Sequence, residues 1–263
     1  MPSKYLSNGI LRDLLSKATN EELLFLTKII NHEIKKPMTP QKLQNEICLC
    51  GGHGVANFFR GQGTSYLDMI DDVINELDIK GFPSYYSNSN KEPALHLIDD
   101  INSIKINLDD AVAKNIKYTK AAEEKIILKL LDESYKRMSP EERLNFDNQI
   151  NDVAKKFGSD PTKKLAGTAG LIALGNLGGF ATYTFLTTSL SAISMGTLGF
   201  GAYTAATSAL SILLGPIGWT GLGLAAVYSY GKPKLNKTIP LIAAIGTIRQ
   251  RIEYDESNIN SSS

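Results

Sequence analysis

The feature that most constrains this chain is a long run without charge, from Leu165 to Gly231. These 67 residues contain no Asp, Glu, Lys, Arg or His, although the whole chain has 28 basic and 27 acidic residues. Thirteen of the 22 glycines also fall within the run. A helix on the surface of a globular protein keeps one polar face. A run of this length must therefore be shielded from water by lipid or by the rest of the protein.

The length of the run predicts a helical hairpin. A membrane span takes roughly 20 mainly apolar residues, and we divide the run into Leu165–Leu190 and Tyr203–Tyr230. Lysines flank the run on both sides, which favours leaving both ends on the cytoplasmic side of a membrane. Gly175 and Gly179 are four residues apart, a spacing that suits close helix packing. The residues expected to mark the hairpin are Leu165, Gly175, Gly179, Phe185, Gly201, Pro216, Trp219 and Tyr228.

The same run also fits a hairpin that is permanently buried by charged helices. Gly, Ser and Thr dilute its Leu, Ile, Val and Phe, and Pro216 interrupts the second segment. Trp219 and Tyr228 suit an aromatic belt at a membrane interface, and they equally suit a packed core. Small residues pack closely in either setting.

The rest of the chain predicts an all-α fold, in which amphipathic helices surround, or are attached to, the glycine-rich apolar hairpin. We expect an N-terminal helical module at 1–36 and a central helical domain at 37–162. The hairpin and a C-terminal helix then occupy 163–253, and a disordered tail occupies 254–263. No strand pattern and no internal repeat stands out.

Local signals place several of these helices. Thr19 with Glu22 three residues later forms a capping box, and Ser139 followed by Pro140 is a strong helix start. Charges of alternating sign in KAAEEKIILKLLDESYKR predict a solvated helix with one buried face. Pro233 and Pro240 are expected to bracket a short connection, and the stretch IPLIAAIGTIRQRI at 239–252 predicts a last amphipathic helix.

A glycine-rich motif, GGHGVANFFRGQGTSYLDMIDDVINEL, lies at residues 51–77. It resembles the central motif of the bacterial YaaW-like family, whose members are often labelled ubiquinol–cytochrome c chaperone-like. The opening YLSNGILRDLLSKATNEELLFL and the later GPIGWTGLG and KTIPLIAAIGTIRQR are similar to other parts of that family. The matching positions of the central motif are Gly51, Gly52, Ala56, Asn57, Arg60, Gly61, Gly63, Tyr66, Ile70, Asp72, Val73 and Leu77. The resemblance implies a fold, and it supplies no catalytic residue.

Two sets of residues around this motif could carry chemistry. Cys48, Cys50 and His53 could be three metal ligands, but structural zinc takes four ligands with a wider cysteine spacing. We therefore expect two small buried thiols beside a helix end, and no metal. Two cysteines separated by one residue also indicate a reducing compartment.

Asn57 and Arg60 could bind an anion in the glycine-rich loop. The commoner use of such an arginine is a two-armed pair with a carboxylate, so we expect both to tie loop carbonyls and Asp72 together. Adjacent acids on a helix point about 100° apart and do not converge. The pairs Asp71–Asp72, Asp99–Asp100 and Asp109–Asp110 are accordingly expected on solvated faces.

Composition narrows the function. A net charge of +1 does not favour nucleic acid as a partner, and the N-terminus lacks the apolar core of a secretory signal. We expect a non-enzymatic cytoplasmic protein that associates with the inner membrane, peripherally or by conditional insertion, through its hairpin. Its expected partners are lipid at the cytoplasmic face and a protein partner or a second copy, with no cofactor. The alternative is a soluble partner-binding or chaperone-like protein whose hairpin is ordinary core.

Overall fold

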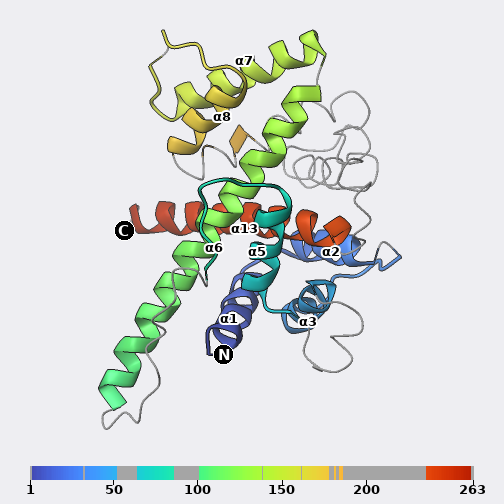
Figure 1. Ribbon diagram of the computed structural model, residues 1–263, viewed down its shortest axis with the longest axis vertical. Helices are drawn as coiled ribbons and strands as arrows, with labels where there is room; N and C mark the ends of the chain where they lie inside the picture. Colours follow the sequence, from blue (N-terminus) through green and yellow to red (C-terminus); the bar gives the residue numbers. More distant parts are fainter. Residues whose placement is uncertain are drawn as a thin grey trace.

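The computed structural model shows an assembly of helices (Figure 1). It describes residues 2–31, 33–51, 64–85, 101–137, 139–160, 162–177, 181, 184–185 and 235–261. The helices in these ranges are α1 (Pro2–Ser16), α2 (Asn20–Ile30), α3 (Pro40–Gly51), α5 (Tyr66–Glu76), α6 (Ile101–Arg137), α7 (Pro140–Lys156), α8 (Gly167–Asn176) and α13 (Leu235–Ser261). The described ranges contain no strand, which confirms the all-α prediction for this part of the chain.

The helix at the centre of the molecule is α13, near the end of the chain. Figure 1 shows it crossing the long helix α6 in the middle of the molecule, with α1, α2, α3 and α5 packed around that crossing. Every residue from Thr238 to Gln250 is buried. A helix that is buried all round is a core helix, so the expectation of an amphipathic last helix is wrong for this stretch.

The bounds of α13 correct two further expectations. Pro240 lies inside the helix and does not precede it. A proline inside a helix costs about 3 kcal/mol, and burial of the apolar residues on both sides of Pro240 offsets that cost. The helix also continues to Ser261, so residues 254–261, expected as part of a disordered tail, are helical.

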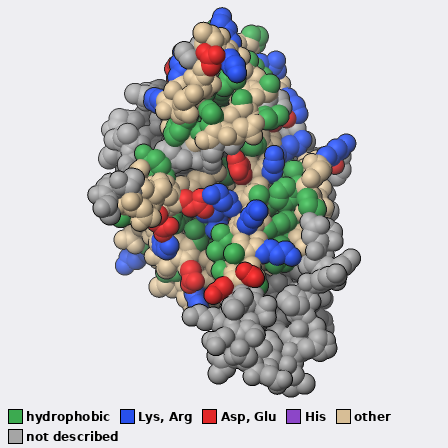
Figure 2. Space-filling view, turned by 90° about the vertical axis from the view of Figure 1, so that its left-hand side faces the viewer, with side chains coloured by type: hydrophobic (Ala, Val, Ile, Leu, Met, Phe, Trp, Pro, Cys, Tyr) green, Lys and Arg blue, Asp and Glu red, His purple; other side chains and the backbone are tan. Residues whose placement is uncertain are grey.

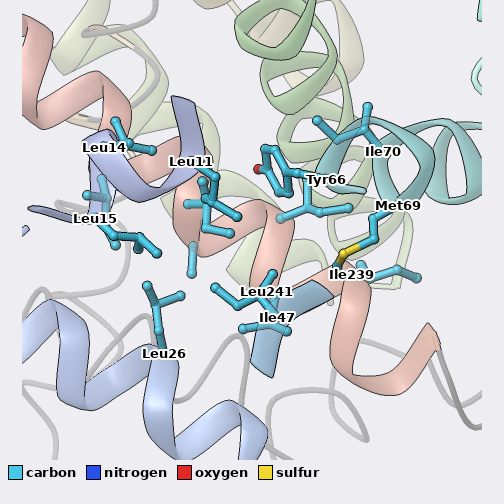
Figure 3. Close-up of a cluster of buried hydrophobic side chains, with 14 of the residues drawn as sticks. Leu11, Leu14, Leu15, Leu26, Ile47, Tyr66, Met69, Ile70, Ile239 and Leu241 are labelled. Carbon is cyan, nitrogen blue, oxygen red and sulfur yellow. The ribbon is translucent and has the colours of Figure 1, made fainter. Parts of the chain in front are cut away.

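The main hydrophobic core lies between six helices. Leu11 and Leu15 of α1, Leu26 of α2, Ile47 of α3 and Leu241 of α13 converge in it (Figure 3). Residues of α5 and α6 complete it, among them Tyr66, Met69, Ile70, Val73, Ala122 and Ile126. The expected N-terminal module, central domain and C-terminal helix thus share one core. None of the described residues of the apolar run belongs to it.

A second, smaller core holds the beginning of the apolar run. Leu171 and Leu174 of α8 are at most 1% exposed, and Phe185 is fully buried. The Phe185 ring meets Phe146 of α7 edge to face, with the ring centroids 4.8 Å apart. The other members come mainly from α6 and α7 and include Ile127, Leu131, Ile150, Val153, Ala154, Ala181 and Ala243. One face of the described start of the run is therefore packed as core.

The two helix starts expected from local chemistry are confirmed. The Thr19 hydroxyl accepts a hydrogen bond from the Glu22 amide at 3.2 Å, and the Glu22 carboxylate accepts one from the Thr19 amide at 2.8 Å. Helices α3 and α7 both begin at a proline. Gly158 follows α7 with φ +83°, a conformation that glycine adopts without strain. Helix α6 begins at Ile101 and contains the whole stretch KAAEEKIILKLLDESYKR, which is predicted to be helical.

Candidate functional site

A buried ion pair joins the two central helices. The Arg249 guanidinium on α13 donates to both oxygens of the Glu123 carboxylate on α6, from Nε at 2.7 Å and from Nη2 at 3.0 Å. The Tyr66 hydroxyl on α5 donates to Glu123 Oε1 at 2.8 Å. None of the three residues is more than 5% exposed. The carboxylate accepts three hydrogen bonds from side chains that fix helices, which indicates a role in holding the fold.

The surroundings of this ion pair keep Arg249 and Tyr66 in the protonation states that their hydrogen bonds require. Burial alone would lower the pKa of Arg249, but the attraction and hydrogen bonds of Glu123 outweigh it, so the pKa is raised. Burial, and then the negative charge of Glu123, raise the pKa of Tyr66 well above its ordinary value. Arg249 therefore stays charged and Tyr66 stays protonated, the states that their hydrogen bonds need.

The close approach of the helices depends on Gly246. A Cβ atom at this position would lie 2.8 Å from Glu123 Cβ and 3.2 Å from Ile127 Cδ1. A separation of 2.8 Å is too short for two carbon atoms, so only glycine fits there without movement of α6. Gly246 is one turn before Arg249 on α13, and its small size brings Arg249 within reach of Glu123.

A second polar cluster holds the point where the apolar run begins. The Asn151 side chain on α7 pairs with Leu165 as a backbone partner would, because Leu165 N–H donates to Oδ1 at 2.8 Å and Nδ2 donates to the Leu165 carbonyl at 2.7 Å. Nδ2 also donates to the Asp147 carbonyl within α7 at 2.6 Å. The first residue of the apolar run is thereby fixed to α7.

Asp147 holds the next part of the run. Its Oδ1 accepts a hydrogen bond from the Gly167 amide at 2.8 Å, and its Oδ2 accepts one from the Tyr135 hydroxyl at 3.0 Å. Gly167 is the first residue of α8, where a carboxylate also favours the positive end of the helix. Its φ of +53° and the Tyr135 ring, 3.1 Å from an added Cβ, leave room only for glycine. We call Tyr135, Asp147, Asn151, Leu165 and Gly167 the junction clamp.

Tyr135 connects the junction clamp to the end of α6. Desolvation and the hydrogen bond to Asp147 raise the pKa of Tyr135, so it remains a donor. Arg143 of α7 lies over the Tyr135 ring at 5.4 Å, and its Nε and Nη2 donate to the carbonyls of Tyr135 and Lys136. The last carbonyls of α6 thus gain partners, and three helices meet at one point.

The chain beyond the far end of the run is also attached. Lys237, in the first turn of α13, donates from Nζ to the Ile30 carbonyl at the end of α2, at 2.8 Å. Further along α13, the Arg251 guanidinium donates to both oxygens of Glu22, at 2.7 and 2.9 Å. Glu22 also closes the capping box of α2, so one carboxylate joins a helix start to the central helix.

The residues expected in the central motif are only partly described. Asn57 and Arg60 lie outside the described residues, so their pairing with Asp72 stays a prediction. Asp72 itself lies on α5 with an exposed side chain. The described edges of the motif lie together, since the Thr64 amide donates to the Cys48 carbonyl at 2.9 Å.

Asp71, expected on a solvated face, is buried. Its carboxylate accepts hydrogen bonds from the hydroxyls of Ser84 and Tyr118, and from the Tyr85 amide at 3.4 Å. The Tyr118 ring packs against those of Phe82 and Tyr85 with centroids 5.3 and 5.2 Å away. These donors repay the cost of burying Asp71. The pair Asp109–Asp110 is exposed as expected, and Asp99–Asp100 lies outside the described residues.

The expectation of two buried thiols beside a helix end is met fully by one cysteine and partly by the other. Cys48 is buried and Cys50 is half-buried near the end of α3. Burial raises the pKa of the Cys48 thiol to about 11, although its hydrogen bond from Gln44 acts in the opposite direction. The described ranges hold no group of three side chains that could bind a metal, and His53 lies outside those ranges.

Of the residues expected to mark the hairpin, some are described by the structure and others are not. Leu165 is half-buried in the junction clamp, Gly175 lies in α8 and Phe185 is core. The other five, outside the described residues, are Gly179, Gly201, Pro216, Trp219 and Tyr228. Among the described helices, none is both long and apolar enough to cross a membrane. Most of the expected hairpin is therefore still a prediction.

Sequence reasoning missed the charged and amide side chains of both polar clusters. Glu123 lies among charges of alternating sign, and Asp147 and Asn151 lie in a strongly polar helix, where nothing separates them from solvated neighbours. Arg249 carried a weak signal, because it directly follows the apolar stretch IPLIAAIGTI. A lone arginine at such a place is compatible with a buried partner, but the sequence does not name that partner.

Comparison with known proteins finds relatives of similar length. The chain is 26% identical over 247 residues to a "UPF0174 protein" of Helicobacter pylori strain J99, covering 90% of this chain and 100% of that protein. A "UPF0174 protein" of strain 26695 is 25% identical over 241 residues, covering 89% and 99%. A further one from strain J99 is 23% identical, covering 90% and 81%. No family model and no solved structure matches. The resemblance to the YaaW-like family stays a prediction.

Proposed function

We propose that this protein is a non-enzymatic, membrane-associating protein, in which a folded helical body carries the apolar run 165–231 to the cytoplasmic face of the inner membrane. The absence of charge across 67 residues supports this proposal. Charged residues are the main obstacle to placing a helix in lipid, at about 2.5 to 3.5 kcal/mol each near the centre. The run presents no such obstacle.

The observation that carries the proposal is the composition of the main core. Of its 24 buried members, 22 come from α1, α2, α3, α5, α6 and α13, and the other two, Met38 and Leu77, lie just outside α3 and α5. No described residue of 165–231 is among them. The buried Arg249–Glu123 pair also lies within this body. These buried residues therefore pack against one another without any contribution from the described start of the run.

The junction clamp fits the role of the element that holds the run to the body. It is made of hydrogen bonds, each contributing about 0.5 to 1.5 kcal/mol. The second core adds the burial of Leu171, Leu174 and Phe185. In this mechanism the apolar segment beyond Phe185 enters lipid first. The junction clamp and α8 open when insertion needs more of the run.

Flotation with lipid vesicles tests the proposal in the full-length chain. We expect wild type to float with the vesicles and to stay bound after a wash in high salt, since apolar insertion is insensitive to salt. The variant Leu213→Lys/Leu214→Lys places two charges in the second expected segment and should be released by that wash. Equal retention of the two proteins would reject the proposal. Far-UV circular dichroism of both proteins checks that the helical body is intact.

A second candidate function is a soluble, partner-binding or chaperone-like protein. It is favoured by the burial of Leu171, Leu174, Ala181 and Phe185 in the second core, because the described start of the run already has a protein cover. Under this alternative the Leu213→Lys/Leu214→Lys variant should unfold or aggregate, and wild type should remain unbound in flotation. The two functions thus predict opposite results for wild type.

A further inference from the structure

The connection between α7 and α8 carries a concentration of positive charge. Lys155 and Lys156 lie in the last turn of α7, and Lys163 and Lys164 lie just before α8; all four are exposed. Residues 152–164 contain these four lysines and two acids, Asp152 and Asp160. The whole chain has a net charge of only +1. The excess is therefore local.

The fold brings the four lysines to one end of the molecule. The chain reverses at Gly158, and the pairing of Asn151 with Leu165 returns it along α7. At the top of Figure 2, the end formed by α7 and α8, most charged side chains in view are basic, whereas the middle of the same face mixes both signs. We call Lys155, Lys156, Lys163 and Lys164 the lysine cluster.

The charges of the lysine cluster are available to a partner. None of the four lysines forms a salt bridge with another described residue. Asp160 is occupied within its own turn, because its Oδ1 accepts hydrogen bonds from the Thr162 amide at 2.9 Å and the Thr162 hydroxyl at 2.7 Å. A set of exposed lysines whose side chains form no salt bridge with the described residues is suited to an anionic surface.

Exposed apolar side chains lie on the same helices. Leu144 of α7 is 62% exposed, and Ile172 of α8 is 56% exposed. Leu144 and Lys155 are eleven residues apart and so point within about 20° of each other from α7. Leu144 and Lys155 thus share an outward face of α7, and a lysine and an apolar side chain on one face are typical of helices that bind at a lipid interface.

We propose that the lysine cluster docks this protein on anionic phospholipid headgroups and so places the start of the apolar run at the membrane surface. The inference rests on the proposed function, and it adds the lipid class and the end of the molecule that touches the membrane first. Each lysine close to an anionic membrane strengthens binding about fivefold, and this attraction falls off within a Debye length. The contact is therefore sensitive to salt, whereas insertion of the run is not.

The test measures binding of full-length protein to vesicles of phosphatidylglycerol and phosphatidylcholine, with pure phosphatidylcholine vesicles as the reference. We expect Lys155→Gln/Lys156→Gln to weaken binding to the anionic vesicles about tenfold or more in low salt. Lys155→Arg/Lys156→Arg keeps the charge and should bind as wild type does. Lys163→Gln/Lys164→Gln changes two lysines that lie outside any helix. This variant gives the same test without any risk of disturbing the end of α7.

Lys35→Gln/Lys36→Gln is the matched control. It also removes two adjacent, exposed lysines, but from the connection between α2 and α3. Binding by this control should stay within about twofold of wild type. If both lysine pairs weaken binding equally, the attraction comes from net charge and the docking proposal is overturned. Unchanged binding of both variants of the lysine cluster overturns it as well.

The same vesicles separate this proposal from the proposed function. If the insertion proposal is wrong but the docking proposal is right, binding to anionic vesicles depends on the lysine cluster. High salt then fully reverses this binding both in wild type and in Leu213→Lys/Leu214→Lys. If the docking proposal is wrong but the insertion proposal is right, wild type and Lys155→Gln/Lys156→Gln stay bound to the vesicles in high salt to the same extent. The two failures therefore give different results.

Discussion

Arg249 and Glu123 form a two-armed ion pair across 126 positions of sequence, where α13 crosses α6. The pair is almost fully buried, with side-chain exposures of 6% and 2%. A buried pair is costly to break by removing one partner, because the other charge is left without compensation. It therefore specifies how the two central helices meet.

Removing Arg249 alone should be strongly destabilising. We expect Arg249→Met to lower the free energy of unfolding by about 3 to 5 kcal/mol, measured by urea denaturation at neutral pH. The triple variant Tyr66→Phe/Glu123→Leu/Arg249→Met leaves no buried charge and should recover much of the loss. Lys17→Met, which removes an exposed ion pair with Glu256, should change stability by less than about 1 kcal/mol. A comparable loss in Lys17→Met would contradict the importance assigned to burial.

Gly246 and Gly9 should respond oppositely to the same substitution. Both lie within helices, but an added Cβ meets Glu123 at 2.8 Å at Gly246 and nothing within 4 Å at Gly9. Alanine is a better helix former by about 1 kcal/mol, so Gly9→Ala should be stabilising. Gly246→Ala should lose about 1 to 3 kcal/mol from overpacking. The change in unfolding temperature of each variant measures this difference. Stabilisation of both variants would show that α6 moves away from an added methyl group at little cost.

The sequence predicted those parts of the fold that depend on neighbouring residues. The capping box of Thr19 and Glu22 and the start at Pro140 are local, because their donors and acceptors lie within one helical turn. The central position of α13 is not local. Two threonines, Arg249 and Gln250 add polar side chains to its sequence, and these are buried only because Glu123 and the other helices cover them.

The roles of single residues in the candidate site also depend on distant parts of the chain, so the sequence did not predict them. Asp71 and Asp72 are chemically identical neighbours, and Asp71 is the buried one because partners from other parts of the chain, Tyr118 on α6 with Ser84 and Tyr85, surround it. Asp147 and Asn151 likewise acquire their role from Leu165 and Gly167, which follow in a separate element. Composition identified where the apolar run begins, but it did not identify what holds it.

Cys48 should make stability depend on alkaline pH. Burial is the main reason that the pKa of its thiol rises from 9.0 to about 11, so the folded state keeps the proton longer than the unfolded state does. Stability from this group is complete below pH 9 and is lost between about pH 9 and 11. The loss is roughly 2 to 3 kcal/mol for a shift of this size.

The measurement is the free energy of unfolding of wild type and Cys48→Ala at several pH values. Other groups, including Tyr66, also titrate in this range, so the difference between the two proteins carries the result. The Cys48→Ala curve should fall less steeply above pH 9. Parallel curves would mean that the thiol ionises in the folded protein as readily as in the unfolded one.

Asn151 should control local opening at the start of the apolar run more than it controls global stability. Asn151→Leu removes the two hydrogen bonds to Leu165, each contributing about 1 kcal/mol. Amide hydrogen exchange in residues 165–177 should accelerate about tenfold or more, because such local openings are governed by their own free energy. Asn148→Leu, an exposed position on the same helix, should leave that exchange unchanged. Acceleration spread evenly over α1 to α13 would show that the junction clamp belongs to the global fold, and then α8 could not separate from α7 while the main core stays closed.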